Sequence, residues 1–256
     1  MHALAGLADD APTQDLRQTC IDVLCAYLRL PSPPDPGDLP NLPDGTSPSQ
    51  EQRAAHRDEK DRYHAMREVR HTILRLIGDH FRIPEGAHRS WQRCNLDLTG
   101  VTIDGDIDFT GAEFSGGEVS FRGALFSSGE VSFRGAVFSG GRVYVNSAGA
   151  LYVEGDAPSG RVYVNGAVSN GSVSFDGAVF SGGEVSFGHA FFDGRVSFRG
   201  ATFFDDRVSF DGAVFSGGRV DFLTAVGPVP AHLLTAVNTP TAAGVLLPPA
   251  WLSVNP

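Results

Sequence analysis

The sequence has few cysteines and no long apolar run. Three cysteines, Cys20, Cys25 and Cys94, occur among 256 residues, and none belongs to a CxxC pair. An odd count without that spacing argues against a disulfide framework and a zinc ribbon, so we expect reduced, buried thiols. No stretch reaches the roughly 18 apolar residues of a membrane span, and the N-terminus lacks the basic start of a signal peptide. We therefore expect a cytoplasmic protein without a transmembrane helix.

Basic charge is also scarce. Lys60 is the only lysine, the net charge is −10, and residues 96–222 contain 16 acidic but only 8 basic residues. Proteins that bind nucleic acid derive much of their affinity from Lys and Arg beside phosphates, so direct nucleic-acid binding is not expected. Residues 223–256 have no Asp, Glu, Lys or Arg.

Two helices are expected in residues 1–94, separated by a proline-rich linker at 31–48. The spacing predicts a helix over 14–29, ended by Pro31, and a second helix over about 50–81 with Ser49 as its N-cap. The expected apolar stripe of the first is Leu16, Cys20, Val23, Leu24, Tyr27 and Leu28. That of the second is Tyr63, Met66, Ile73, Leu76, Ile77 and Phe81. Because the start of the second helix is almost wholly charged, only its later turns are expected to pack on the rest of the chain.

Residues 95–222 repeat one short unit, for example SGGEVSFRGALF (115–126) and SSGEVSFRGAVF (127–138). Each unit contains a segment similar to V-S-F. Its first apolar residue is, in order, Ile107, Val119, Val131, Val143, Val173, Val185, Val196, Val208 and Val220. The gaps are 11 or 12 residues, except across 144–171, where the spacing slips. A fixed short period indicates a solenoid.

Each unit contains two apolar pairs with strand spacing. In V-x-F and in A-x-F the first and third side chains point to the same side of a strand, which we assign to the interior. Glycines such as Gly117 and Gly123 fit the corners, where a positive φ is needed. Successive units are expected to stack Phe on Phe.

Phe121, Phe126 and Val131 follow one another at steps of five residues. Such steps, with a small residue two positions before a large apolar one, resemble the pentapeptide repeat family. The closest matches are the segments Asn95–Ile103 and Phe109–Phe114. The resemblance implies an all-β solenoid, a right-handed β-helix used for binding, here preceded by a small helical region like that of membrane-associated members. Some members imitate DNA and block type II topoisomerases. A period of 12 does not fit coils made of four five-residue steps alone, so the number of residues per coil stays open.

Two patterns resemble calcium sites. Asp104, Asp106 and Asp108 have the spacing that begins a calcium loop, but Phe109 stands where glycine is required and Ser115 where the bidentate glutamate belongs. The Gly-Gly pairs are similar to calcium-binding nonapeptides, but their period differs. We expect no metal or other cofactor.

Two further groups of polar residues are candidate sites. Asp205, Asp206 and Asp211 with Arg207 could form a glycosidase or lyase site on a β-helix face, but solvated outward positions explain them equally well. The five histidines between residues 56 and 88 are expected to be exposed helix residues rather than metal ligands: His56, His64, His71, His80 and His88. No nucleophile motif is recognisable, and we expect no enzyme and no catalytic, cofactor-binding or metal-binding residues.

The expected function is a non-catalytic protein-interaction scaffold with an unidentified protein partner. A DNA-mimicking regulator of a type II topoisomerase is the first alternative, although Glu118, Arg122 and Arg142 show that the outward charges have mixed signs. Peripheral membrane association is the second. The uncharged segment 223–256 is expected to cap the last coil, with docking to a membrane or partner as the alternative. Its capping residues would be Leu233, Leu234, Val245, Leu246, Leu247 and Trp251. Oligomeric state is open, and a dimer is compatible with the sequence.

Overall fold

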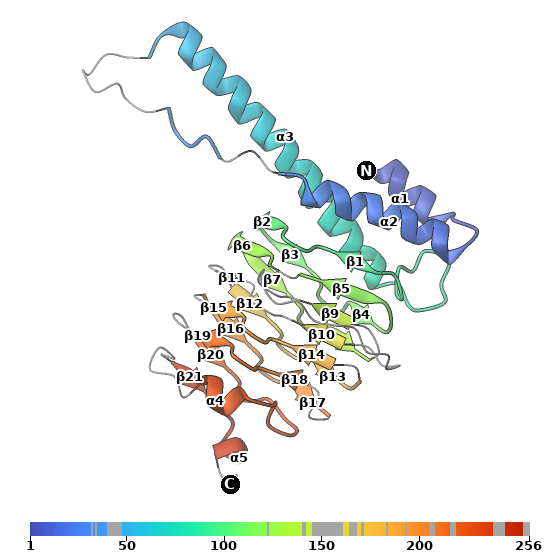
Figure 1. Cartoon of the computed structure of the whole chain (residues 1–256), viewed down its shortest axis with the longest axis vertical. Coiled ribbons are helices and arrows are strands. Elements are labelled where there is room, and N and C mark those ends of the chain that lie inside the picture. The colour runs from blue at the N-terminus through green and yellow to red at the C-terminus, as the bar shows by residue number, and fades with distance from the viewer. Residues whose placement is uncertain are drawn as a thin grey trace.

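The chain forms a β-solenoid with a helical region at its N-terminal end (Figure 1). A computed structural model describes residues 1–31, 33, 35–39, 48–121, 123–139, 142–144, 161–163, 168–169, 172–182, 184–192, 194–204, 208–215, 219–237 and 244–252. The expected all-β solenoid preceded by helices is confirmed. No helix in this part of the chain is long and apolar enough to cross a membrane.

Three helices precede the solenoid: α1 (His2–Asp9), α2 (Gln14–Arg29) and α3 (Gln50–Phe81). The bounds of α2 and α3 are those that the apolar spacing predicts. Ser49 caps α3 through a capping box with Gln52. The first turns of α3 project beyond the solenoid (Figure 1), and its burial begins at Tyr63. Helix α1 is not among the elements predicted from the sequence.

The buried face of α2 differs from the expected stripe. It consists of Ile21, Leu24, Cys25 and Leu28. Leu16 and Val23, which were expected to be buried, are 52% and 51% exposed. Apolar residues cover more than half of this helix, so apolar spacing alone could not decide which side meets the solenoid.

Four parallel sheets run along the solenoid, and the chain adds a strand to each sheet in turn, except where two consecutive strands join the same sheet. Sheet A contains β1 (Leu96–Asp97), β5 (Glu118–Ser120), β9 (Arg142–Tyr144), β10 (Arg161–Tyr163), β14 (Glu184–Ser186) and β18 (Val208–Ser209). Sheet B contains β2 (Thr102–Asp104), β6 (Leu125–Ser128), β11 (Val168–Ser169), β15 (Phe191–Phe192) and β19 (Val214–Phe215). Sheet C contains β3 (Ile107–Asp108), β7 (Glu130–Ser132), β12 (Ser172–Ser174), β16 (Val196–Ser197), β20 (Val220–Asp221) and β21 (Val245–Leu246). Sheet D contains β4 (Glu113–Phe114), β8 (Val137–Phe138), β13 (Val179–Phe180) and β17 (Thr202–Phe203).

One coil contains two of the sequence units. Leu96 pairs with Val119, and Val119 pairs with Val143, so a coil advances by 23 or 24 residues. The coil is therefore four-sided after all, but longer than four five-residue steps. Opposite sides of the coil come from the same part of the unit. The V-x-F segments supply the strands of sheets A and C, and the A-x-F segments supply those of sheets B and D.

The slipped segment 144–171 does not end the ladder. In the register of sheet B, Val168 pairs with Leu125 on one side and with Phe191 on the other. Val131 pairs with Val173, 42 residues later. The extra residues therefore enter between β9 and β10, which both belong to sheet A.

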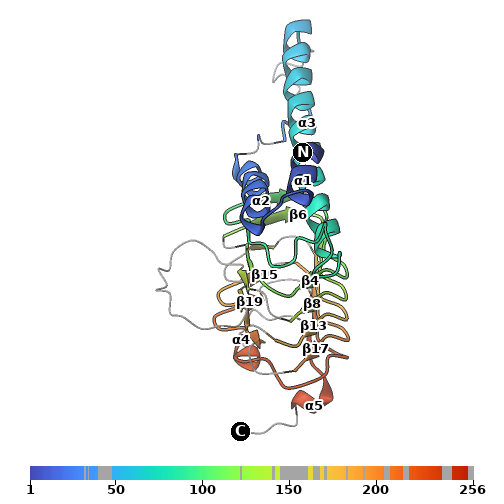
Figure 2. The ribbon, with the colours of Figure 1, turned by 90° about the vertical axis from the view of Figure 1, so that its right-hand side faces the viewer.

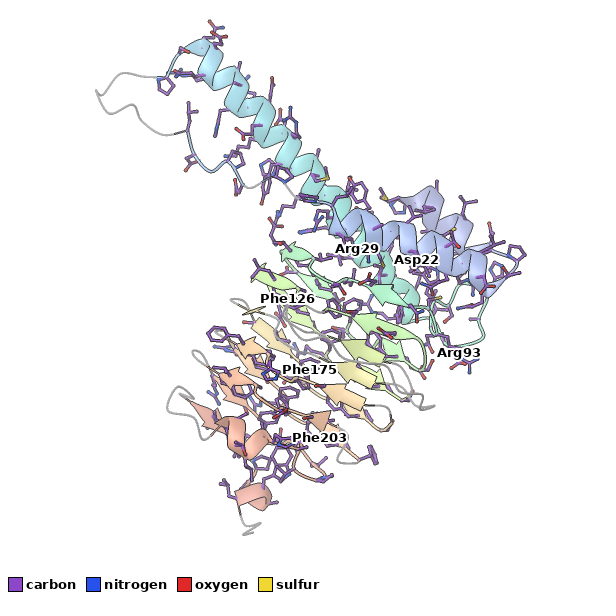
Figure 3. All side chains as sticks on the ribbon, in the orientation of Figure 1. Asp22, Arg29, Arg93, Phe126, Phe175 and Phe203 are labelled. Carbon is purple, nitrogen blue, oxygen red and sulfur yellow. The ribbon has the colours of Figure 1, made fainter. Side chains whose placement is uncertain are left out.

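The interior is lined by stacked phenylalanines, as expected. Along one corner the rings of Phe109, Phe133, Phe175, Phe198 and Phe222 stack with centroids 4.5–5.2 Å apart. This separation is close to the distance of about 4.8 Å between neighbouring strands, so each coil places its ring directly on the one before. Phe126, Phe175 and Phe203 are labelled in the stack of coils in Figure 3.

Both ends of the solenoid are covered. At the N-terminal end, the ring of Phe81 lies 5.3 Å from that of Phe114, and Trp91 is fully buried. At the C-terminal end, α4 (Leu233–Val237) and α5 (Pro249–Leu252) lie beneath the last coil (Figure 2). There Leu233 and Trp251 are buried, and the indole N–H of Trp251 donates to the carbonyl oxygen of Gly227. Leu234, Val245, Leu246 and Leu247 are half-buried.

Candidate interaction faces

The outward side chains differ between neighbouring sides of the coil. In sheets A and C the position after the inward valine is mostly serine, for example Ser132 and Ser197. In sheets B and D the residue between the inward alanine and phenylalanine is mostly apolar, for example Leu125 and Val137. Two opposite sides of this solenoid therefore present apolar rows.

The row on sheet B runs along the whole sheet. Strand register aligns Thr102, Leu125, Val168, Phe191 and Val214 as direct neighbours. Leu125 is 36% exposed and Phe191 is 38% exposed, while Val214 is half-buried. We call this row the sheet B ladder.

The row on sheet D is flatter. It aligns Glu113, Val137, Val179 and Thr202, all half-buried, and a bridge continues it to Val226, which is 54% exposed. Its side chains are smaller than those of Leu125 and Phe191. We call this row the sheet D ladder.

Charged residues near sheet D have alternating signs. Arg134, Asp176 and Arg199 succeed one another at the corner between sheets C and D, since Gly135 donates to Asp176 O and Gly177 to Arg199 O. The carboxylate of Asp221 accepts a hydrogen bond from Arg219 at 3.1 Å and lies 3.9 Å from Arg199. The signs mix here, as the sequence indicated, so these columns form no row of carboxylates.

Two of the three carboxylates that resemble a calcium loop, Asp104 and Asp108, instead hold the helical region on the first coil. Asp104 accepts hydrogen bonds from Tyr63 and from Arg67, and Asp108 accepts one from Arg82 at 2.8 Å. Asp106 accepts the backbone N–H of Glu130. In the described part of the chain no three His, Cys, Asp or Glu side chains converge as a metal site would require.

The electrostatics of Asp104 reflect this docking. Burial alone would raise its pKa, but hydrogen bonds from Tyr63 and Arg67 outweigh that effect and lower it. The same hydrogen bond to Asp104 raises the pKa of Tyr63 to about 12. Nearby, the buried Arg70 donates to the carbonyl oxygens of Leu30 and Thr102, which ties α3 to the end of α2 and to sheet B.

A second cluster fixes α1. The buried carboxylate of Asp9 accepts hydrogen bonds from Arg89 at 2.9 Å and from the Trp91 indole at 3.1 Å. His80 lies with Nε2 3.1 Å from Asp9 and Nδ1 2.5 Å from the carbonyl oxygen of Leu76. His80 thus bridges the Asp9 carboxylate and the backbone of α3. Burial tends to raise the pKa of Asp9, but the Arg89 hydrogen bond and the His80 charge lower it overall.

Of the five histidines, only His64 is an exposed helix residue as expected, since His88 lies beyond the end of α3. His80 is buried in the Asp9 cluster, and His71 is half-buried, 2.9 Å from the backbone oxygen of Asp104. His64 and His88 are exposed and His56 is half-buried. Sequence spacing could not reveal the roles of His71 and His80, since their partners lie 33 and 71 residues away.

The remaining candidates are placed as follows. Asp205, Asp206 and Arg207 lie outside the described residues, and Asp211 is exposed. Cys25 and Cys94 are buried and Cys20 is half-buried, and burial raises the pKa of the Cys25 thiol to about 12. A thiol with such a pKa is a poor nucleophile at neutral pH.

The apolar ladders are the feature that the sequence interpretation missed. The signal was present, because the middle residue of A-x-F is Leu, Val, Phe or Thr in six of its seven copies. Because Ala and Phe both point inward, strand alternation makes the residue between them point outward.

Comparison with known proteins agrees with this geometry. A family model described as pentapeptide repeats matches nine copies over residues 98–143 and 159–202. Searches of curated proteins and of solved structures gave no significant match. The matched segments contain strands of all four sheets. The β-helix of this chain therefore belongs to the pentapeptide repeat family.

Proposed function

We propose that the protein is a non-catalytic scaffold that binds another protein through the outward faces of its β-helix. The observation that carries this proposal is the pair of apolar ladders on opposite sides of the coil. Apolar side chains on a solvent-facing sheet weaken solubility and mark contact surfaces when they are contiguous. The interior needs none of them, since it is already filled by the inward Val, Ala and Phe.

A second feature supports a rigid binding surface. Every coil is held by the parallel ladder, by the stacked rings and by caps at both ends. Flat faces presented by such a stack change little on binding, so a partner loses less free energy to ordering the surface. The alternating charges beside sheet D give no support to the imitation of a nucleic-acid duplex.

The test is site-specific photo-crosslinking of the full chain in its native lysate. A photoreactive phenylalanine analogue replaces Phe191 in the sheet B ladder, Val179 in the sheet D ladder, or Ser197 on sheet C as the matched control. We expect one protein partner to be captured at a ladder position, in a saturable manner, and not at position 197. Equal capture at all three positions, or turnover of a polysaccharide substrate by the purified chain, would contradict the proposal.

A further inference from the structure

The sheet B ladder places Leu125, Phe191 and Val214 in one row with a fixed step between neighbouring strands. Its five positions, from Thr102 to Val214, succeed one another at the distance between strands, about 4.8 Å, and so span roughly 19 Å. The side of the ladder that faces sheet A has glycine with positive φ at Gly100, Gly123 and Gly212. His189 takes the corresponding corner beside Phe191, and its ring lies against Gly212, so backbone without side chains borders only part of the row.

This step suits a helix better than a strand. An α-helix presents an apolar residue about every 3.5 positions, which is a step of about 5.3 Å along its axis. A modest tilt of the helix reduces that step to the inter-strand distance. An extended partner repeats on one face only about every 6.7 Å, and the ladder offers it no unpaired strand edge.

A charge gradient runs parallel to the ladder. At the corner between sheets B and C, the residue before the inward residue of each sheet C strand is successively Asp106, Glu130, Ser172, Arg195 and Arg219. The first two are acidic, the third is neutral and the last two are basic. All of them except Ser172 are exposed. Although Arg219 pairs with Asp221, that carboxylate is shared with Arg199, so the three residues together keep one positive charge.

The sheet D ladder lacks these properties. Val137 and Val179 are half-buried, and the neighbouring charges of Arg134, Asp176 and Arg199 alternate. Alternating signs favour neither direction for a charged partner. The ordered charges beside sheet B therefore favour a partner with a matching order of charges, whereas the alternating charges beside sheet D favour none.

We infer that sheet B binds an amphipathic α-helix of a partner protein, about 13 residues long, lying along the solenoid axis. Its apolar stripe covers Leu125, Phe191 and Val214. Its basic half lies beside Asp106 and Glu130, and its acidic half lies beside Arg195 and Arg219. This inference rests on the proposed scaffold function and adds the face and the chemistry of the partner.

The test uses three stapled 15-residue helices with the same leucine stripe, titrated into the full chain by fluorescence anisotropy. The block probe has lysines flanking one half of the stripe and glutamates flanking the other. The alternating probe has the same composition with the charges interleaved, and the third probe has only glutamates. At low salt the block probe should bind roughly fivefold more tightly than either, because each surface ion pair contributes a small amount. High salt should remove that difference.

Matched variants assign the face. Leu125→Thr combined with Phe191→Thr should weaken the block probe by about tenfold or more. Threonine already occupies equivalent outward positions at Thr102 and Thr202, so folding should be kept, and circular dichroism checks it. Val137→Thr combined with Val179→Thr on sheet D should leave the affinity within about twofold.

The outcomes separate the two proposals. Equal affinity of the block and alternating probes, or greater loss from the sheet D variant, overturns this inference while capture at a ladder position still supports the scaffold function. A dimer of the chain that dissociates in the Leu125→Thr/Phe191→Thr variant would assign sheet B to a second copy and likewise overturn it. If no probe binds and no ladder position captures a protein, both proposals fail.

Discussion

Phe191 and Phe192 are adjacent residues of one type that the fold places on opposite sides of sheet B. Phe191 is 38% exposed in the ladder, whereas Phe192 is 2% exposed and stacks on Phe215 with ring centroids 5.3 Å apart. Replacing each with alanine in separate variants removes the same atoms from neighbouring positions. The difference between the two losses in free energy of unfolding therefore compares a buried phenylalanine with an exposed one on the same strand.

The expected magnitudes differ clearly. Phe192→Ala leaves a cavity in the stack and should reduce the free energy of unfolding by about 3–5 kcal/mol. Full burial of a phenylalanine contributes about 1.5–3 kcal/mol, and Phe191 is only partly covered, so Phe191→Ala should cost about 1 kcal/mol. Equilibrium urea denaturation followed by far-UV circular dichroism measures both, with the slopes compared because repeat proteins can unfold in stages.

Similar losses at the two positions, or a larger loss at Phe191, would refute the assignment. A register shift of one residue exchanges the two faces of a strand, so such a result would put the ladder inside and the stack outside. Phe203 and Phe204 provide an independent repeat of the comparison, since they are 1% and 64% exposed. There Phe203→Ala should again cost several kcal/mol, roughly as at Phe192, and Phe204→Ala almost nothing.

Three further predictions concern the ends and one corner. Asp9→Asn should cost about 3 kcal/mol, because it removes one partner of a buried charge cluster, and hydrogen exchange should show α1 losing protection. Because folding lowers the pKa of Asp9, its stabilisation is complete above about pH 4 and is lost as the pH falls through the folded pKa; melting curves from pH 7 to 3 should show this limb in the parent and not in Asp9→Asn. His189→Gly should raise stability by up to about 1 kcal/mol, since His189 has a φ of 54° where other corners have glycine; a lower melting temperature would show that its ring contacts matter more. Trp251→Ala should cost about 3–5 kcal/mol and expose the last coil to hydrogen exchange first, whereas Leu252→Ala, at a 69% exposed position, should do neither.

Most of the fold could be read from local signals. Ser49 and Gln52 mark the start of α3, and Pro31 follows the end of α2, because capping and proline effects act within a few residues. The alternation in V-x-F and A-x-F gave the inward residues correctly, since strand geometry leaves no other choice for a repeated apolar pair. The stacking of the phenylalanines follows from the same repeat.

The closure of the coil and the docking of α1 could not be predicted, because both depend on contacts between residues far apart in the sequence. Closure of the coil after two units is set by the corners and by pairing of residues 23 or 24 apart, such as Leu96 with Val119. The helix α1 is short, and the Asp9 cluster that fixes it contains His80, Arg89 and Trp91, far along the chain. Its docking has no local signature in the sequence.

The same reasoning explains why the apolar ladders were not predicted, although their residues are plain in the sequence. A unit of five, five and two residues gives one coil from two units, so each part of the unit reappears on the opposite side of the solenoid. The fold needs only the inward positions and the glycine corners, which leaves the middle of A-x-F free to vary. At that position Leu125, Val137, Val179, Phe191 and Val214 are apolar, although serine occupies the corresponding outward position of V-x-F in most units. Serine occurs at these neighbouring outward sites, where Ser120, Ser174 and Ser186 are buried. The fold therefore accepts either kind of residue beside an inward pair, and the proposed function assigns the apolar choice to contact with another protein.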